Sequence, residues 1–444
     1  MPSDTIPASP TNISETAVLA KLTRRLVPFL FLLYIVAYLD RINVGFAKLQ
    51  MSSQLHFSEA VYGLAAGMFF AGYFVFQVPS NLILNRIGAR RWISLLMVVW
   101  GAISACMMFV TTPRRFYVMR FLLGLAEAGF FPGMILYLRS WFPASARARA
   151  IALFMTAGPL SGVLGGIVSG AILSLRHPGA LAAWQWLFLL EGLPAIARGG
   201  VVFFHLADRP EEARWLSDGE RSWLQGVLLS EQNAFAVSGD PAPWWSVFFD
   251  PRVLLLGLSY FCLNSSTYGI SLWLPSVLNE LSARSSFGVG VLSAIPYLAA
   301  AVGMVIVGHH SDRTGERRWH AAGSACCASV ALLLAASSSS TFLVVVAFSV
   351  AVLGIFAYVG PFWAMPGTLL TGVTASAGIA FINSVGNLGG FAGPYILGVA
   401  RTSSGNFKSG LLVLAGAMLL CAILVLLVRM PEASNYRRDD PRKV

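Results

Sequence analysis

The sequence is poor in charged residues: Lys, Arg, Asp and Glu make up 11% of its 444 residues, whereas a soluble domain carries about 25%. Its five cysteines all fall in apolar segments, without the spacing of a disulfide framework or a zinc site. The first twenty residues lack the basic start and apolar run of a secretory signal and are expected to form a loose cytosolic tail. These absences argue against a soluble globular protein and against a disulfide-linked secreted one.

Motifs of catalysis are also missing. The chain has no Gly-x-Ser-x-Gly elbow, no Gly-Lys-Ser/Thr phosphate loop and no His-Glu-x-x-His helix. We therefore predict no enzyme, no catalytic residue, no metal site and no organic cofactor. The formal net charge of +11 does not indicate nucleic acid, because Lys and Arg are spread over the ends of apolar segments rather than clustered on one soluble face.

Long apolar segments are abundant instead, since 56% of the residues are hydrophobic. Segments of about 20 residues can cross the hydrocarbon core of a membrane as helices. Strands that cross a bilayer are shorter and alternate in polarity. We predict an all-α polytopic membrane protein with twelve spans, at 24–47, 60–84, 92–111, 116–138, 148–172, 184–206, 252–277, 288–310, 320–338, 341–365, 373–400 and 409–429.

The distribution of Lys and Arg predicts the orientation, because cytosolic loops of membrane proteins carry the excess of these residues. With the N-terminus inside, the inner segments hold seventeen of them and the outer segments hold seven. The outer seven are Lys48, Arg114, Arg115, Arg176, Arg284, Arg401 and Lys408. We therefore expect both termini in the cytosol and, for a bacterial chain, a location in the inner membrane.

One long polar segment divides the spans six and six. We predict a cytosolic tail at 1–23, a six-helix bundle at 24–206, a cytosolic linker at 207–250, a second bundle at 251–429 and a tail at 430–444. The linker alternates acidic, basic and apolar residues, which is typical of amphipathic helices that lie at a membrane surface. A binding module is the alternative interpretation of the linker.

The two predicted bundles share internal repeats. The segment 81–91 follows the second span, and 308–318 follows the eighth with an offset of 227 residues. The fifth span carries Gly158-Pro159 and the eleventh carries Gly393-Pro394. Repeated halves with matching Gly and Pro interruptions are typical of transporters that bind a solute between two halves near the membrane midplane.

The segment 308–318 matches Gly-x-x-x-Asp-Arg-x-Gly-x-Arg-Arg closely, and this pattern resembles the signature of the major facilitator superfamily. The carboxylate in such a loop can cap a helix and bind the guanidinium groups, which makes a latch that breaks when the halves move. In the first copy, Asn81 and Asn85 replace the Gly and the Asp. We assign gating roles to six residues of these loops: Asn85, Arg86, Arg91, Asp312, Arg313 and Arg317.

Several further motifs occur in order along the chain, among them Tyr38-Leu-Asp-Arg41, Arg120-Phe-Leu-Leu-Gly-Leu-Ala-Glu127, the run 208–216 and the run 383–394. Together they resemble the anion:cation symporter family, within it the tartrate-transporter branch and more distantly the D-galactonate and sialic acid carriers. The resemblance implies two six-helix bundles, alternating access, and import of a small organic anion with protons as the coupling ion. We expect the chain to work as a monomer in the lipid bilayer.

Charged residues inside the spans indicate function, because a charge at the bilayer centre costs about 2.5 to 3.5 kcal/mol even on insertion scales. By resemblance to the galactonate-type carriers, Asp40 and Glu127 couple protons and Arg41 binds the substrate carboxylate. Arg120 pairs with an acid or with the substrate, and it lies two helical turns from Glu127 on one face. The alternative is a fixed salt bridge, Asp40–Arg120 or Glu127–Arg120, that only holds helices together.

Glu191 is assigned to charge pairing, although it precedes a Gly-Leu-Pro break and could simply satisfy freed backbone donors. Polar side chains within the spans are candidate substrate contacts. In the first half they are Tyr38, Tyr73 and Gln77, and in the second half Trp363, Asn383 and Asn387. Asn387 could instead pack within a glycine-rich helix interface.

Two other functions remain open at this point. The glycines around Gly158-Pro159 and Gly165-Gly166 faintly resemble an antiporter motif, so an exporter of organic acids on the same scaffold is one alternative. A membrane sensor that binds a solute without moving it is the other.

Overall fold

The computed structural model describes residues 14–176, 178–237, 244–282, 284–370 and 372–430, and this part of the chain is helical without strands. The first half contains α1 (Glu15–Leu55), α2 (Glu59–Ile87), α3 (Ala89–Cys106), η1 (Met107–Phe109), α4 (Pro113–Glu127), α5 (Phe130–Trp141), α6 (Ala144–Met155), α7 (Ala157–Ser174) and α8 (Ala183–His205). The linker contains η2 (Pro210–Glu212), α9 (Asp218–Val237) and η3 (Trp244–Phe249). The second half contains α10 (Pro251–Ser282), α11 (Ser286–Thr314), α12 (Arg318–Ser337), α13 (Thr341–Leu369), α14 (Gly372–Ser404) and α15 (Lys408–Leu427).

Each predicted span corresponds to one helix or to a pair of consecutive helices, and none extends more than two residues beyond them. The fourth span is α4 followed by α5, and the fifth is α6 followed by α7. The first of these breaks falls at Gly129, where an added Cβ would lie 1.7 Å from Ser80 Oγ of α2. Glycine is therefore required there by the close approach of α2. The predicted all-α membrane fold is confirmed.

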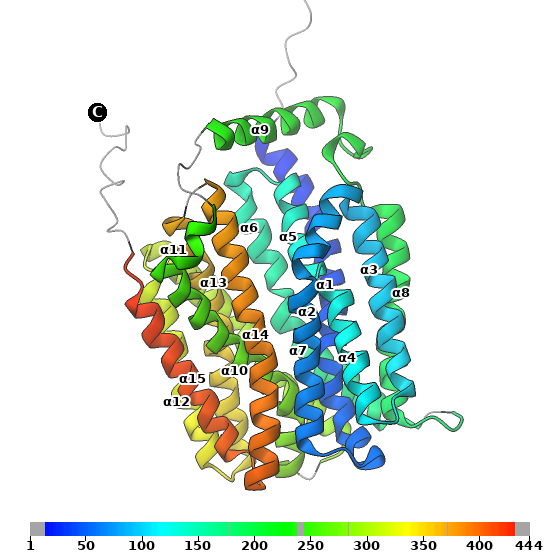
Figure 1. Cartoon of the computed structure of the whole chain (residues 1–444). Helices are drawn as coiled ribbons and strands as arrows, with labels where there is room; N and C mark the ends of the chain where they lie inside the picture. Colours follow the sequence, from blue (N-terminus) through cyan, green and yellow to red (C-terminus); the bar gives the residue numbers. More distant parts are fainter. Residues whose placement is uncertain (1–13, 177, 238–243, 283, 371, 431–444) are drawn as a thin grey trace, which may run out of the picture.

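Among the described residues, eleven helices or helix pairs are long and apolar enough to span a membrane. The segment missing from this set is α14, the eleventh predicted span. Its glycines together with Asn383 and Asn387 lower its hydropathy. It nevertheless runs along the height of the bundle beside α10 and α2 (Figure 1).

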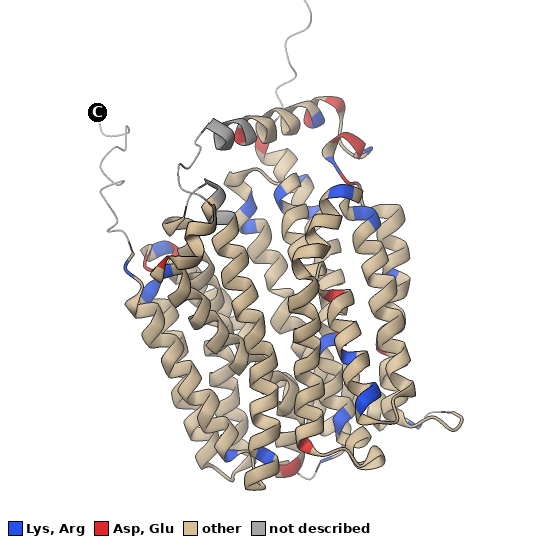
Figure 2. Ribbon diagram, in the orientation of Figure 1, with Lys and Arg blue, Asp and Glu red and all other residues tan. Residues whose placement is uncertain are grey.

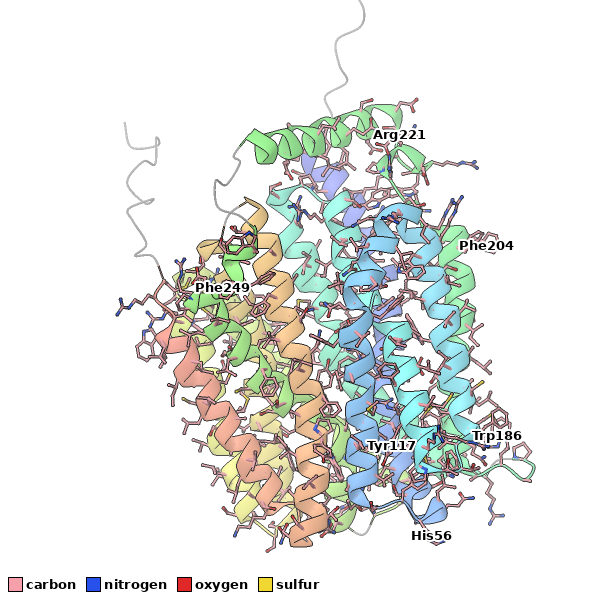
Figure 3. All side chains as sticks on the ribbon, viewed as in Figure 1. His56, Tyr117, Trp186, Phe204, Arg221 and Phe249 are labelled. Atoms are coloured by element: carbon pink, nitrogen blue, oxygen red, sulfur yellow. The ribbon has the colours of Figure 1, made fainter. Side chains whose placement is uncertain are left out.

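The first six spans and the last six form the two sides of the molecule, and α9 lies across one end (Figure 1). Helix α1 begins and α15 ends at this same end. Side chains of His56, Tyr117 and Trp186 mark the opposite end, and Arg221 marks the α9 end (Figure 3). The predicted C-terminal tail lies outside the described residues except for Met430, and α1 begins at Glu15, within the predicted N-terminal tail.

The two sides meet most closely at the end away from α9. Helix α7 packs on α11, where an added Cβ at Gly290 would lie 2.2 Å from the carbonyl oxygen of Gly166. Helix α2 packs on α14, where an added Cβ at Gly63 would lie 2.8 Å from the carbonyl oxygen of Pro394. Small residues allow helix backbones to approach in this way in membrane proteins.

Candidate functional site

Buried charges are confined to the first half of the described chain. Charged ribbon segments in the second half lie at the helix ends (Figure 2). The buried charged side chains are Asp40, Arg41, Lys48, Arg120, Glu127 and Glu191. No charged residue of α10–α15 is buried in the part that the structure describes. Because a buried charge is costly unless it is paired, the partners of these six residues define the candidate site.

An ion pair between α1 and α4 lies at the boundary with the second half. The Nη2 atom of Arg41 is 3.0 Å from Oε2 of Glu127, and its Nε donates to the same oxygen at 3.3 Å. Nη1 of Arg41 donates to the hydroxyl oxygen of Tyr268 on α10 at 3.2 Å. The guanidinium also lies over the rings of Phe69 and Tyr73, with Cζ 5.2 and 5.3 Å from the ring centroids. Arg41 thus connects both halves.

Arg120 lies beside this pair without an acceptor of its own. Its side chain is fully buried, and none of its three guanidinium nitrogens has a hydrogen-bond partner among the described residues. Its guanidinium lies over the ring of Phe69, with Cζ 5.0 Å from the ring centroid. Neither of the two considered salt bridges, Asp40–Arg120 or Glu127–Arg120, is formed in the described structure. A buried guanidinium without an acceptor is a strong site for an anion.

Asp40 faces away from Arg41, into the first half. Its Oδ2 accepts from Nε1 of Trp100 at 3.1 Å, and its Oδ1 accepts from Oγ of Ser104 at 2.8 Å, both on α3. Nδ2 of Asn43 lies 3.5 Å from Oδ1. Three neutral donors therefore surround a fully buried carboxyl group that forms no ion pair with any residue that the structure describes. Such a group can gain or lose a proton without breaking an ion pair.

Glu191 occupies a second acidic position within the first half. Its Oε1 accepts from Oγ of Ser169 on α7 at 2.7 Å, and its Oε2 has no hydrogen-bond partner among the described residues. No cation lies within 4.0 Å of it in the described structure. The expected charge pairing of Glu191 is therefore not seen in this conformation, and a hydroxyl takes that place.

The predicted substrate contacts fall into two groups. Tyr73 lies under Arg41, and Gln77 of α2 accepts through Oε1 from Nδ2 of Asn387 on α14 at 3.0 Å. That hydrogen bond joins the two halves near the Arg41 pair. Tyr38 is buried on α1. Trp363 packs against Tyr260, with ring centroids 5.0 Å apart, and Asn383 is half-buried on α14.

The predicted gating residues lie at the α9 end. Asp312 pairs with Arg317, with Oδ1 and Nη1 2.5 Å apart. Asn85, Arg86, Arg91 and Arg313 are exposed. The two loops are therefore unequal, because only the second contains an acid that binds its own arginine.

Two residues of the site were not anticipated from sequence. Tyr268 follows the polar run Asn264-Ser-Ser-Thr267 inside an apolar span, which was the available signal. Lys48 was taken as an outer-loop charge, yet it is buried at the end away from α9, 2.8 Å from Oε2 of Glu59 and 3.2 Å from Oγ of Ser276. Its Nζ lies 4.6 Å from the ring centroid of Trp273, so it bridges the halves there.

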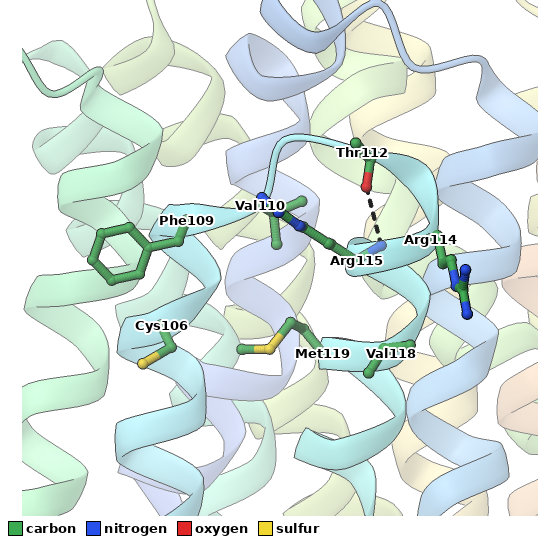
Figure 4. A pocket seen from close by; sticks show the side chains of 8 residues that line it. All are labelled: Cys106, Phe109, Val110, Thr112, Arg114, Arg115, Val118 and Met119. Atoms are coloured by element: carbon green, nitrogen blue, oxygen red, sulfur yellow. Dashed lines mark hydrogen bonds between the residues drawn. The ribbon is translucent and has the colours of Figure 1, made fainter.

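A pocket of about 560 Å³ lies apart from these residues (Figure 4). It is lined by the end of α3 and the start of α4, including Arg114, Arg115 and Met119. In Figure 4, Oγ1 of Thr112 accepts from the backbone N–H of Arg115, which caps α4. Since the pocket holds none of the buried charges, we place the functional site at the Arg41–Glu127 pair.

The linker binds the first half at the end where α9 lies. Nζ of Lys21 lies 2.7 Å from Oε2 of Glu220. The hydrogen bond from Lys21 and a second from the backbone N–H of Ser217 lower the pKa of Glu220. At its other end, Glu231 accepts from the backbone N–H of Ala144 at 2.7 Å and pairs with Arg147 at 2.9 Å. The linker as far as α9 is therefore joined to the first half, whereas η3 packs against α14 of the second half, where the ring centroids of Phe248 and Phe381 lie 5.2 Å apart.

The molecule consists of long apolar helices arranged in two halves, with buried acids and guanidiniums where the halves meet. This arrangement defines a polytopic membrane transporter rather than an enzyme. Residues 30–394 and 284–444 match the Major Facilitator Superfamily. The chain belongs to this superfamily and is a secondary transporter.

Relatives share most of the chain. A protein of Agrobacterium vitis named "Putative tartrate transporter" is 47% identical over 96% of this chain and 95% of its own length. The "Quinolone resistance transporter" of Acinetobacter baumannii is 38% identical over 93% of this chain and 95% of its own. The "Inner membrane transport protein RhmT" of Escherichia coli is also 38% identical, over 93% of this chain and 96% of its own.

The fold is similar to that of a solved transporter. The crystal structure of a bacterial homologue of the human lysosomal transporter Spinster, in an inward-facing and unoccupied conformation, superposes with a TM-score of 0.70. The match covers 94% of this chain and 96% of that chain at 15% identity, which supports the fold alone.

Proposed function

We propose that this chain imports a small organic anion, a tartrate-like dicarboxylate or a sugar acid, together with protons. The observation that carries the proposal is the pairing of Arg41 with Glu127 beside Arg120, which has no acceptor. A carboxylate can bind either guanidinium, so the site offers two cationic groups to an acid with two polar ends. The names of the Agrobacterium vitis relatives support the tartrate-like class.

Proton coupling follows from competition for Arg41. While Glu127 is ionised it occupies the guanidinium at 3.0 Å. Protonation of Glu127 removes its negative charge and frees Arg41 for the carboxylate of the solute. When Glu127 releases the proton on the other side of the membrane, its carboxylate pairs with Arg41 again and displaces the solute. Asp40, surrounded by neutral donors, provides a second position at which a proton can offset the charge of the anion.

The two halves rock about this site, so that the site opens alternately to the two sides of the membrane. We propose an inward-facing state for the present conformation, because the tightest helix contacts lie at the end away from α9 and the linker. In this assignment the gating loops, Asn85 to Arg91 and Asp312 to Arg317, and both termini are cytosolic. The Gln77–Asn387 hydrogen bond joins the halves near the solute. A location in the inner membrane is supported by the name of the Escherichia coli relative.

Uptake into proteoliposomes tests this function. The purified chain is reconstituted and given labelled tartrate or galactonate, with and without an inward proton gradient, and with a protonophore as control. We expect accumulation that requires the gradient and collapses with the protonophore. Absence of gradient dependence for every anion tested would contradict the proposal.

The same experiment separates the alternatives. An exporter, the function to which the name of the Acinetobacter baumannii relative corresponds more closely, would release preloaded solute in exchange for entering protons. A sensor would bind the anion, measured by calorimetry, without any flux.

A further inference from the structure

The two inner loops solve the same electrostatic problem in different ways. In the second half, the loop between α11 and α12 carries two acids. Asp312 pairs with Arg317 at 2.5 Å, and Oε2 of Glu316 accepts from the backbone N–H of Trp319, the second residue of α12, at 2.8 Å. One acid neutralises an arginine, and the other caps a helix N-terminus.

The corresponding loop of the first half contains neither acid. With the offset of 227 residues, Asp312 corresponds to Asn85 and Glu316 to Ala89. The arginine is retained, because Arg317 corresponds to Arg90. Helix α3 begins at Ala89, so its first turn and this arginine both lack an acid within the loop.

The missing carboxylate comes from outside the loop. Asp208 lies three residues after the end of α8. Its Oδ1 accepts from the backbone N–H of Arg90, the second residue of α3, at 2.7 Å. Its Oδ2 lies 3.9 Å from Nε of the same arginine. One carboxylate therefore makes both contacts that two acids make in the second half.

The surroundings of Asp208 fit this role. Gly88 has a φ of 91°, and an added Cβ there would lie 2.8 Å from both carboxylate oxygens. Glycine is thus required both by the backbone conformation and by the space that the carboxylate occupies. The hydroxyl of Tyr137 donates to the carbonyl oxygen of the neighbouring Ala207 at 2.9 Å, and Cζ of Arg90 lies 5.9 Å from the ring centroid of Phe203.

We propose that Asp208 is the acid of the first gating loop, displaced to the start of the linker. It caps α3, neutralises Arg90 and fastens the linker to the loop. The first half and the linker as far as α9 consequently move as one unit, held by Asp208 at the start of this segment and by Glu231 within α9. In each gating loop an arginine is then paired with an acid and a helix start is capped by an acid, although the acids come from different parts of the chain. This role does not depend on which solute is carried.

Restoring the acids in the loop tests the proposal. Asp208→Asn is compared with Asp208→Asn combined with Asn85→Asp and Ala89→Glu, and with the two loop substitutions alone. The control is Asp218→Asn, which removes the same charge from a linker carboxylate with a side chain 97% exposed. The measurements are the melting temperature of the purified protein and the rate of trypsin cleavage after the exposed Arg214.

We expect Asp208→Asn to lower the melting temperature by about 2–4 °C and to speed cleavage several-fold, because a helix cap and an arginine partner are lost together. The loop acids should reverse both effects in that background and give no gain in the unchanged chain, where Asp208 already fills their place. If Asp208→Asn fails to fold, the combined variant should fold. A response of Asp208→Asn equal to that of Asp218→Asn, or loop acids that restore nothing, would overturn the proposal.

Discussion

The two halves of this transporter share a repeated helix pattern but differ in chemistry. The first half holds every buried charge of the described chain, whereas the second half contributes neutral groups to the same region, such as Tyr268 and Asn387. A charge that changes its environment must be paid for in desolvation. When the charges stay together in one half, the other half can move past them by exchanging hydrogen bonds from neutral groups, without breaking an ion pair. The asymmetry indicates that the first half binds the solute through its charges, and that the second half forms a neutral side of the site with Tyr268 and Asn387.

The largest expected effect comes from removing the acids of the charged half. Glu127→Gln and Asp40→Asn should each abolish accumulation of the anion against its gradient, because no proton can then be exchanged. Counterflow of labelled for unlabelled solute should persist in part, since the guanidiniums remain. Both are measured in proteoliposomes, with Glu280→Gln in the second half as the matched control, because Glu280 pairs with Arg401 at the surface.

Undiminished accumulation in both variants would contradict the difference between the halves, because coupling would then not reside in the acids of the first half. Loss of accumulation in Glu280→Gln would also contradict it, because an acid of the second half would then be required.

Substitution of the two buried arginines by methionine should change the free energy of unfolding in opposite directions. Arg41→Met leaves Glu127 buried without a partner, which costs about 3–5 kcal/mol. Arg120→Met removes a buried charge that has no acceptor, and should raise the free energy of unfolding by about 1–3 kcal/mol. Both variants should lose anion binding. Melting temperatures and binding calorimetry measure the two effects separately.

Equal destabilisation by the two substitutions would mean that Arg120 has a structural partner in the membrane. The charged half would then be a set of fixed salt bridges, as one interpretation of the sequence allowed.

The smallest of these effects concerns the neutral side of the site, which the second half forms. Tyr268→Phe removes one hydrogen bond to Arg41, so we expect the affinity for the anion to fall about 5- to 10-fold, which corresponds to about 1 kcal/mol. Tyr395→Phe on the exposed side of α14 is the control and should leave the affinity unchanged. An unchanged affinity in Tyr268→Phe would show that the second half does not act through Arg41.

Helices and their order could be predicted from the sequence because apolar segments of this length have a single solution in a membrane. The buried charges could also be found, since each stands out from its apolar span. Their pairing could not. Arg120 and Glu127 share one helix face, yet the carboxylate binds Arg41 from α1. Helix rotation and crossing decide between such partners, and neither is encoded in spacing along one helix.

Residues with two possible environments were the hardest to interpret. Tyr268 belongs to an apolar span in which a tyrosine can equally face lipid or the neighbouring half. Lys48 was taken as a loop residue because α1 continues to Leu55, beyond the predicted end of the span. Asp208 was interpreted as one of the acids of the linker and as part of a family motif, because its partner Arg90 lies 118 residues earlier in the chain. Long-range pairs of this kind appear only when the helices are placed.

The low hydropathy of α14 has a consequence for biogenesis. A segment so rich in glycine, with Asn383 and Asn387, gains little by entering lipid alone, whereas its glycines fit closely against α10 and α2, as where an added Cβ at Gly389 would lie 2.1 Å from the carbonyl oxygen of Phe261. Its insertion should therefore depend on helices synthesised earlier, so that assembly of the two halves is completed only when α14 finds both of them. In truncated chains that lack α2, α14 should therefore remain outside the bilayer. Contacts with the earlier helices, rather than with lipid, would stabilise the inserted helix.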